Sequence, residues 1–313
     1  MENEKKPRVI ITGGTGFIGR PLSLRLVQEG YEVVCLTRDA AAAEKKWDNK
    51  VRFVDWDAKT AAGWGEYADG AEAIVNLAGD SIGSGRWTGE KKRKIRQSRM
   101  NAGRAVVEAV RVAKQKAGAV IQASAIGIYG SRGKESLDES SEPGEGFLAD
   151  VAREWENSTK EIESWGVRHV ITRSGLVLGA DGGSLPRMLL PYRFFVGGPL
   201  GSGKQWMSWI HIRDEIEGFL FLLGRKDLNG VFNLTAPHPL QNKLFSRELG
   251  KAMGRPSWFP VPSFLLKLIF GQMAIETILT SQRVLPARLE EAGFTFTFPD
   301  IPDALADILE KKS

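Results

Sequence analysis

At 313 residues the chain can bury a large core, because folds of this size remove roughly three quarters of their unfolded surface from water. Its formal charge of +5 is modest for this length, and Lys and Arg are interspersed with Asp and Glu over most of the chain. A single cysteine, Cys35, excludes a disulfide framework and a thiolate metal cluster, and we expect no metal site. The composition favours an intracellular enzyme that binds an anionic ligand.

The N-terminal residues are charged and lead directly into the fold, without the apolar core of a signal peptide. No stretch reaches the roughly 18 to 20 apolar residues that a membrane-spanning helix needs. The sequence therefore predicts a cytoplasmic protein without a membrane partner.

Short apolar runs that predict strands alternate with stretches that predict helices. The runs are residues 8–12, 32–37, 51–54, 73–77, 118–123 and 167–173. This alternation is typical of βαβ units around a parallel sheet, with helices on both faces. The longest predicted helix extends from about Thr88 to Lys116. We expect an α/β fold, a Rossmann-type doubly wound parallel sheet with a smaller, mainly helical C-terminal lobe for substrate.

Residues 130–146 are rich in Gly, Ser, Glu and Pro and predict a surface loop, and further turns are expected at 179–183 and 197–203. Beyond residue 237, prolines interrupt helical stretches such as Phe264–Leu279. We interpret that stretch as a packed helix of the lobe; the alternatives are a partner-binding or membrane-surface helix. The predicted domains are 8–237, with 178–205 contributing to the substrate lobe, and 238–313.

A β-branched run at residues 8–12 opens straight into a glycine loop and then a helix. Gly13, Gly16 and Gly19 have the spacing G-x-x-G-x-x-G, and Gly14 adds the G-x-G-x-x-G pattern. Glycines permit a sharp turn and the close approach of backbone N–H groups to a pyrophosphate, and the helix starting near Phe17 adds its positive N-terminal end. The predicted phosphate cradle consists of Gly13, Thr15, Gly16, Phe17, Ile18 and Gly19.

The second predicted strand ends in Thr37 and Arg38, where an NAD enzyme would offer a carboxylate to the ribose 2′-hydroxyl. A hydroxyl and a guanidinium can instead hydrogen-bond a 2′-phosphate, so we predict NADP(H) as the cofactor. Asp39 follows at once and could reach the ribose instead.

Two further strand ends extend the predicted cofactor site. Asp57 follows the third strand, where an adenine edge would lie, and a turn carboxylate is the alternative interpretation. Leu77, Ala78 and Gly79 close the fourth strand, where small residues would let the dinucleotide pass.

With these residues in place, the chain resembles the extended short-chain dehydrogenase/reductase (sugar-nucleotide epimerase) superfamily. Within it, the chain is similar to the atypical subgroup of "epimerase family proteins", sometimes described as cell-division inhibitors. The resemblance covers nearly the whole chain and rests on residues 13–19, 76–79, 98–99, 124–125, 129–130, 173–179, 201–206, 209–212, 214, 255–256 and 293–294. It implies NADP(H) contacts by Thr37, Arg38, Leu77, Ala78, Arg99 and Val177.

In the wider superfamily a tyrosine transfers the proton and a lysine four residues later assists it. None of the four tyrosines here has a lysine at that spacing. The resemblance places Phe147 and Val151 at those two positions, so it does not by itself imply reductase or epimerase activity for this chain. It also places Ala125 at the usual serine position.

The remaining candidates for acid-base or substrate-orienting work are Ser124, Tyr129, Arg173 and His211. A histidine can titrate near neutrality. A lone histidine between isoleucines, however, is more often a hydrogen-bonded structural residue.

The basic run Lys91–Arg99 would raise the local potential for a phosphorylated ligand, although most of its lysines are expected on a solvated helix face. No recognised nucleic-acid motif accompanies the run, and we expect no nucleic-acid partner. Two functions are left open. The first is an NADP(H)-dependent oxidoreductase or epimerase acting on an unknown small carbonyl or nucleotide-sugar-like substrate. The second is a non-catalytic, cell-division-linked NADP(H)-binding regulatory protein, and a homodimer is left open for both.

Overall fold

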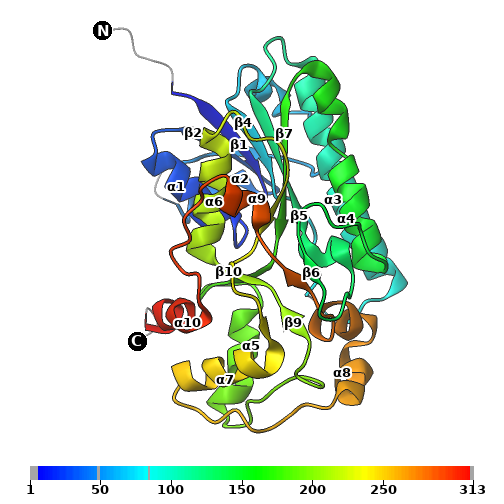
Figure 1. Cartoon of the computed structure of the whole chain (residues 1–313). Helices are drawn as coiled ribbons and strands as arrows, with labels where there is room; N and C mark the ends of the chain where they lie inside the picture. The colour runs from blue at the N-terminus through cyan, green and yellow to red at the C-terminus, as the bar shows by residue number, and fades with distance from the viewer. Residues whose placement is uncertain (1–5, 48–49, 84, 311–313) are drawn as a thin grey trace.

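A seven-stranded parallel sheet forms the centre of the computed structural model, which describes residues 6–47, 50–83 and 85–310 (Figure 1). The spatial order of the strands is β11-β7-β5-β4-β1-β2-β3, and all neighbours are parallel. Their bounds are Arg8–Thr12 (β1), Glu32–Thr37 (β2), Arg52–Asp55 (β3), Ala73–Asn76 (β4), Ala119–Ala125 (β5), Arg168–Ser174 (β7) and Gly230–Leu234 (β11). The predicted Rossmann-type sheet is confirmed, and β11 is an edge strand that the sequence did not reveal.

The strand order reverses between β1 and β4. The chain first moves outward from β1 to β2 and β3, and then returns to place β4 on the other side of β1. In open parallel sheets, ligands bind outside the carboxyl ends of the strands at such a switch point. The segments that follow Thr12 and Asn76 therefore lie where a ligand is expected.

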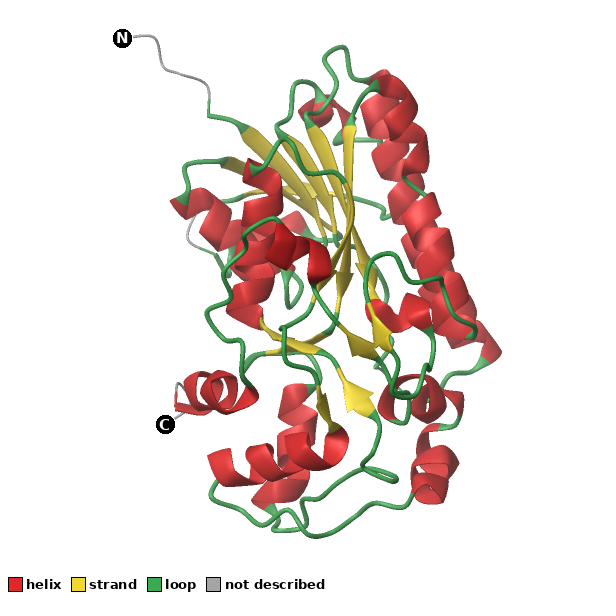
Figure 2. Cartoon of the chain, in the orientation of Figure 1, coloured by secondary structure: helices red, strands yellow, loops and turns green. Residues whose placement is uncertain are grey.

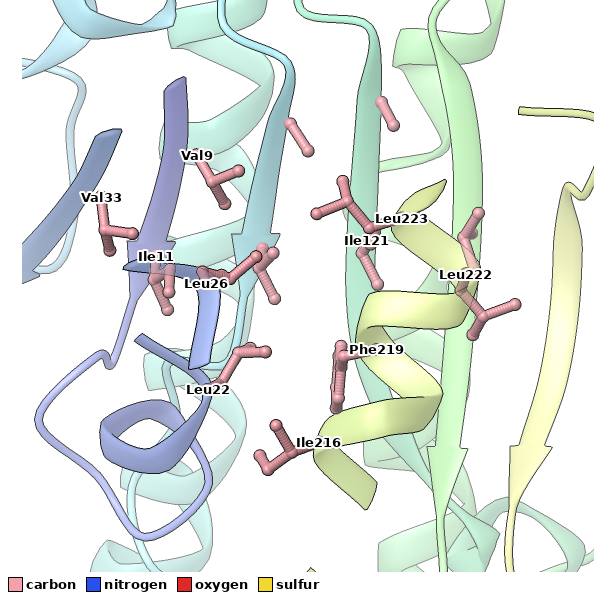
Figure 3. Close-up of a cluster of buried hydrophobic side chains, with 14 of the residues drawn as sticks. Val9, Ile11, Leu22, Leu26, Val33, Ile121, Ile216, Phe219, Leu222 and Leu223 are labelled. Atoms are coloured by element: carbon pink, nitrogen blue, oxygen red, sulfur yellow. The ribbon is translucent and has the colours of Figure 1, made fainter. Parts of the chain in front are cut away.

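Helices cover both faces of the sheet (Figure 2). On one face, α1 (Gly19–Gln28) and α6 (Ile212–Gly224) contribute Leu22, Leu26 and Phe219 to an apolar cluster that also contains Val9 of β1 and Ile121 of β5 (Figure 3). The other face is covered by α3 (Gly89–Val112) and α4 (Phe147–Asn157). Shorter elements complete the sheet domain: α2 (Ala40–Glu44), η1 (Gly65–Ala68), η2 (Ile126–Tyr129) and η3 (Lys160–Trp165).

The long helix α3 follows from the spacing of its small apolar residues. Ala102, Ala105, Val106, Ala109 and Val110 are buried, three or four residues apart, and so form one stripe against the sheet. Thr88 caps the helix, because its Oγ1 accepts a hydrogen bond from Lys91 N at 3.1 Å. The helix ends at Val112, four residues before the predicted end.

A smaller lobe lies below the carboxyl end of the sheet in Figure 1. Its helices are α5 (Leu185–Arg193), α7 (Asn242–Ala252), α8 (Ser263–Phe270) and α10 (Ile301–Glu310). Three two-stranded sheets pair β8 (Leu176–Leu178) with β10 (Trp209–His211), β9 (Trp206–Met207) with β12 (Leu240–Gln241), and β6 (Ser136–Leu137) with β13 (Arg283–Val284). Residues 130–146 form the predicted surface loop, apart from the two-residue strand β6.

Part of the predicted lobe segment returns to the sheet domain. In α9 (Ala287–Glu291), Leu289 is fully buried in the α1/α6 cluster, and Arg288 donates hydrogen bonds to the carbonyl oxygens of Val231 (2.6 Å) and Asn229 (2.9 Å). The domain boundary near residue 237 stays a prediction. No helix within the described ranges is long and apolar enough to cross a membrane.

The prediction of one packed helix over Phe264–Leu279 is wrong on two counts. Helix α8 ends at Phe270, because Gly271 adopts φ +61°, and a π-helical turn, η4 (Ala274–Ile278), follows. In α8 only Leu266 is buried, whereas Phe264 and Leu268 are 70% and 68% exposed. The sequence pattern showed that the stretch is apolar, but not that Phe264 and Leu268 stay exposed.

Candidate functional site

The glycine loop after β1 is closed so tightly that two of its positions cannot hold a side chain. Gly13 adopts φ +70°, and Gly16 N donates to its carbonyl oxygen at 3.0 Å. A Cβ atom on Gly19 would overlap that carbonyl oxygen and lie 2.7 Å from Gly14 Cα. On Gly14, a Cβ would overlap the sulfur of Cys35 on β2. At these two positions the loop therefore presents backbone atoms and no side chains.

The N-terminus of α1 faces the same loop without a competing group. The helix begins at Gly19, two residues after the predicted start. Ile18 supplies no side-chain cap, and the first turn contains no acidic residue. Thr15 and Gly16, in the middle of the loop, are exposed. An anion above the loop would thus meet backbone N–H groups and the positive end of the helix dipole.

The segment after β4 lies directly against the glycine loop. Thr12 Oγ1 donates to Asn76 Oδ1 at 2.6 Å and accepts from Ala78 N at 3.1 Å. A Cβ on Gly13 would lie 3.2 Å from the carbonyl carbon of Leu77. These contacts bring two predicted cofactor segments, 13–19 and 77–79, together at the switch point.

Phe17 connects the glycine loop to the segment that follows β8. A Cβ placed on Gly179, Gly182 or Gly183 would come within 3.0 Å of the Phe17 ring, so the ring lies against these three glycines. Val177 precedes them on β8 and is mostly buried. The structure thus brings the predicted cofactor residues Phe17 and Val177 close together.

Thr37 and Arg38 lie at the carboxyl end of β2, and the Arg38 side chain is exposed. Asp39, the residue that could have reached a ribose instead, caps α2, since its Oδ1 accepts a hydrogen bond from Ala42 N at 2.8 Å. Asp57 holds its own turn by accepting from Lys59 N at 2.7 Å and Thr60 N at 2.9 Å. The Asp39 carboxylate is thus engaged by its own helix, whereas no such contact ties Arg38 among the described residues.

Arg99 on α3 reaches the same edge of the sheet beside Gly79. Its Nη1 donates to the carbonyl oxygens of Asp80 at 3.1 Å and Ile95 at 2.9 Å, and its guanidinium lies 4.8 Å from the centre of the Trp155 ring. Burial lowers the pKa of Arg99 to about 10, although the charge of Asp80 opposes this effect. Within the described ranges no carboxylate forms an ion pair with it. The negative charge of a bound anion would offset the free-energy cost of burying this cation.

Ser124, Tyr129 and Arg173 form one buried network with two residues that the sequence did not single out. Arg173 binds the Glu156 carboxylate through Nε at 2.8 Å and Nη2 at 2.9 Å. Ser124 Oγ donates to Glu156 Oε1 at 2.6 Å.

The same network continues through the phenol. Arg173 Nη1 donates to Tyr129 Oη at 2.9 Å, and this hydroxyl donates to Asn233 Oδ1 at 2.8 Å. All five side chains are less than 10% exposed, and burial raises the pKa of Tyr129. The network joins the carboxyl ends of β5 and β7 to α4 and β11.

His211 lies outside this network. Its Nδ1 accepts a hydrogen bond from Arg213 N at 3.0 Å, which caps α6, and its ring stacks on Phe298 at 4.0 Å between centroids. Its Nε2 lies 3.3 Å from a carboxylate oxygen of Asp307 on α10. These contacts attach the first turn of α6 to the C-terminal helix.

A family model described as the NAD dependent epimerase/dehydratase family matches residues 9–235. The chain belongs to this family. The glycine loop, the segment after β4 and the Ser124 network all lie within the matched residues. A second model, a domain of unknown function (DUF1731), matches residues 261–308 of this epimerase-family chain.

The named relatives identify the atypical short-chain dehydrogenase/reductase subgroup. The chain is 39% identical over 302 residues to the epimerase family protein YfhF of Bacillus subtilis, covering 96% of this chain and 97% of that protein. It is 38% identical to the chloroplastic SDR39U1 homologue of Arabidopsis thaliana, covering 99% and 88%. The crystal structure of human SDR39U1 with NADPH matches with a TM-score of 0.87 and 32% identity, covering 97% of this chain and 99% of that one.

Phe147 and Val151, which the family resemblance predicts at the positions of the tyrosine and the lysine, belong to an apolar cluster in this epimerase-family chain. Phe147 and Val151 on α4 pack with Trp87, Ile95 and Met273. The rings of Phe147 and Trp87 meet edge to face with centroids 5.2 Å apart. A hydrocarbon cluster can neither give nor accept a proton, so a reaction at this site needs another proton route.

A buried carboxyl group that the sequence did not single out lies on the other face of β7. Glu215 on α6 accepts a hydrogen bond from Ser174 Oγ at 2.6 Å, and burial raises its pKa to about 8. Ser174 follows Arg173 directly on β7, so the two side chains point to opposite faces of the sheet. No group of three or more metal-ligating side chains occurs among the described residues.

Proposed function

We propose that the chain binds NADP(H) at the switch point and catalyses hydride transfer to or from a small carbonyl or nucleotide-sugar-like compound. The observation that carries the proposal is the glycine loop: Gly14 and Gly19 leave no room for a side chain, and the uncapped N-terminus of α1 faces the same surface. Such a loop offers N–H groups and a helix dipole to a pyrophosphate.

The residues at this edge of the sheet fit a dinucleotide. The amides of the loop and α1 would hold the pyrophosphate, and Ala78 and Gly79 would border the dinucleotide beside β4. When bound, the nicotinamide would supply hydride chemistry. Arg99, whose charge has no carboxylate partner among the described residues, would stabilise a phosphate or an anionic substrate group.

We infer a preference for NADP(H) over NAD(H) from the end of β2. The guanidinium of Arg38 is exposed there, while Asp39 is occupied as the cap of α2. The human SDR39U1 structure contains NADPH, which supports the same choice for this chain.

The change Arg38→Ala tests the preference. We expect NADPH affinity to fall roughly 10- to 100-fold, because a charge-assisted hydrogen bond contributes on the order of 1.5 to 3 kcal/mol, while NADH affinity stays the same. Calorimetric titration of both cofactors into both proteins measures this. Arg104→Ala, which removes an exposed arginine from α3, is the matched control. Equal NADPH affinity in the wild type and Arg38→Ala would remove the argument.

Hydride transfer itself is tested with NADPH that is stereospecifically deuterated at C4 of the nicotinamide. Incubation of the protein with a metabolite extract should transfer deuterium to a product, which mass spectrometry detects. If the protein is an oxidoreductase, replacing the residue that transfers the proton should lower turnover and leave cofactor affinity intact. The variants that test the three candidates are Ser124→Ala, Tyr129→Phe and His211→Ala. If neither stereoisomer of the deuterated NADPH gave a labelled product, the proposal that the protein is an enzyme would be contradicted.

A second function, NADP(H) binding without catalysis, is favoured by one observation. Phe147 and Val151, which the family resemblance predicts at the positions of the tyrosine and the lysine, lie in an apolar cluster, and the tyrosine candidate Tyr129 is fully buried. In this alternative, occupancy of the site by cofactor orders the lobe for a partner. Cofactor binding without any deuterium transfer is the result that would select it.

A further inference from the structure

The small lobe carries nearly all of the large apolar side chains that the described part of the chain exposes. Twelve of the fourteen lie between residues 190 and 275, and only Leu24 and Val112 lie elsewhere. Nine of the twelve form the set that we call the lobe tip: Phe194, Phe195, Val196, Trp258, Phe259, Phe264, Leu265, Leu268 and Ile269. Monomeric soluble proteins rarely expose apolar groups in such a concentration without a surface to bind.

Backbone contacts hold the segments of the lobe tip side by side. Phe259 N donates to the carbonyl oxygen of Gly197 at 3.1 Å, and Val261 N donates to that of Pro199 at 2.9 Å. Residues 194–200 therefore lie against 258–262, and α8 begins at the next residue, Ser263. Three segments thus make one continuous edge of the molecule, the lower edge in Figure 1.

Helix α8 presents its apolar side outward. Phe264 and Leu268 are one turn apart, as are Leu265 and Ile269, and all four are exposed. The opposite side contributes Leu266 to the lobe. With eight residues, α8 is too short to span a membrane, but its exposed stripe is suited to lie in an interface.

The two segments of the lobe that contain this edge are strongly basic, whereas the charged residues of α10, the last helix of the lobe, are all acidic. Segments 182–211 and 238–275 contain eight Lys and Arg residues and one acidic residue, Glu248, for a net charge of +7. The whole chain has a net charge of +5, so all other residues together carry −2. Arg255 lies 4.4 Å from the centre of the Phe195 ring, and Arg247, Lys251 and Arg255 line one surface hollow with Trp258.

We propose that the lobe tip docks on an anionic membrane surface. The aromatic and aliphatic side chains would enter the headgroup region, and the surrounding cations would pair with anionic lipid headgroups. A second copy of the chain is a poorer occupant, because a two-fold interface would place this cationic surface against itself. The proposal revises our sequence-based expectation of no membrane partner, and it does not depend on the proposed catalytic function.

Co-sedimentation of the full chain with vesicles tests the proposal. Binding is expected to vesicles that contain about 30% phosphatidylglycerol in phosphatidylcholine, and to be weakened at least roughly tenfold in pure phosphatidylcholine or in 0.5 M NaCl, because charges at the surface are screened by salt. The variants Phe264→Ser/Leu268→Ser and Arg255→Glu/Lys267→Glu should each lose at least roughly tenfold in binding.

Matched controls distinguish vesicle binding by the lobe tip from nonspecific binding and from an effect of misfolding. Val112→Ser removes an apolar side chain that is 63% exposed on α3, and Lys114→Glu/Lys134→Glu reverses two exposed cations outside the lobe tip. Both should bind vesicles like the wild type, and all variants should retain the wild-type circular dichroism spectrum. Absence of vesicle binding would overturn the proposal. So would a dimer, detected by light scattering, that Phe264→Ser/Leu268→Ser converts to monomer.

Discussion

Gly19→Ala is expected to weaken NADPH binding by roughly 100-fold or more, equivalent to at least about 2.7 kcal/mol. The added methyl group would overlap the carbonyl oxygen of Gly13 and lie 2.7 Å from Gly14 Cα, so the loop must open. Because both contacts are to backbone, no side chain can rotate away to relieve them. Opening the loop turns its N–H groups away from a pyrophosphate, and calorimetric titration with NADPH measures the loss.

Two other glycines calibrate this result. Gly16→Ala adds a Cβ only 3.1 Å from Gly13 O, a tight contact but a smaller conflict, so its effect should be smaller. Gly89→Ala adds a methyl group to the first residue of α3, where nothing lies within 4 Å, and should leave affinity unchanged. Thermal melting of all three variants separates loss of the loop from loss of the fold. An affinity for Gly19→Ala close to that of Gly16→Ala would contradict the backbone-cradle interpretation.

The glycine loop was predictable because its geometry is local. The β-branched run, the glycine spacing and the helix that follows all lie within residues 8–28, and each conformational requirement is carried by a residue inside that segment. The same holds for α3, whose buried stripe follows from spacings of three and four residues. Local patterns therefore fixed most of the sheet and one side of the candidate site.

Features that depend on distant partners were not predictable in this way. Strand β11 is five residues long, and its pairing partner β7 lies about 60 residues earlier, so nothing in its own sequence identifies it as a sheet edge. Glu156 and Asn233 join the Ser124 network from α4 and β11 across sequence separations of 32 and 104 residues. A single glutamate on an amphipathic helix gives no sign that it will be buried beside an arginine.

Helix α8 shows a third limit of sequence patterns. Its composition predicts an apolar helix, which is correct, but burial depends on what packs against it. Gly271 turns the chain away after Phe270, and Phe264 and Leu268 stay mostly exposed. The exposed stripe that results is a property of the tertiary structure, and the proposal of membrane docking depends on it.

Arg173→Met is expected to destabilise the folded protein by about 3 to 5 kcal/mol, because it leaves the buried Glu156 carboxylate without its cation. The bidentate pair in the native protein joins β7 to α4 with both side chains below 10% exposure. Urea denaturation at neutral pH measures the change. Arg153→Met, which breaks an exposed pair with Asp150, is the matched control and should cost less than about 1 kcal/mol.

The double variant Arg173→Met/Glu156→Leu decides whether the cost comes from the unpaired charge or from lost packing. Removing both charges should recover much of the stability, because an apolar pair needs no buried counterion, although Tyr129 and Ser124 each lose a hydrogen-bond partner. If the double variant is as unstable as Arg173→Met alone, the network stabilises the fold through packing and phenol contacts instead. Deuterium transfer by the folded double variant, measured beside its NADPH affinity, then separates the two possible uses of this network. Unchanged affinity with lost deuterium transfer would assign the network to chemistry, whereas unchanged values of both would assign it to holding α4 and β11 against the sheet.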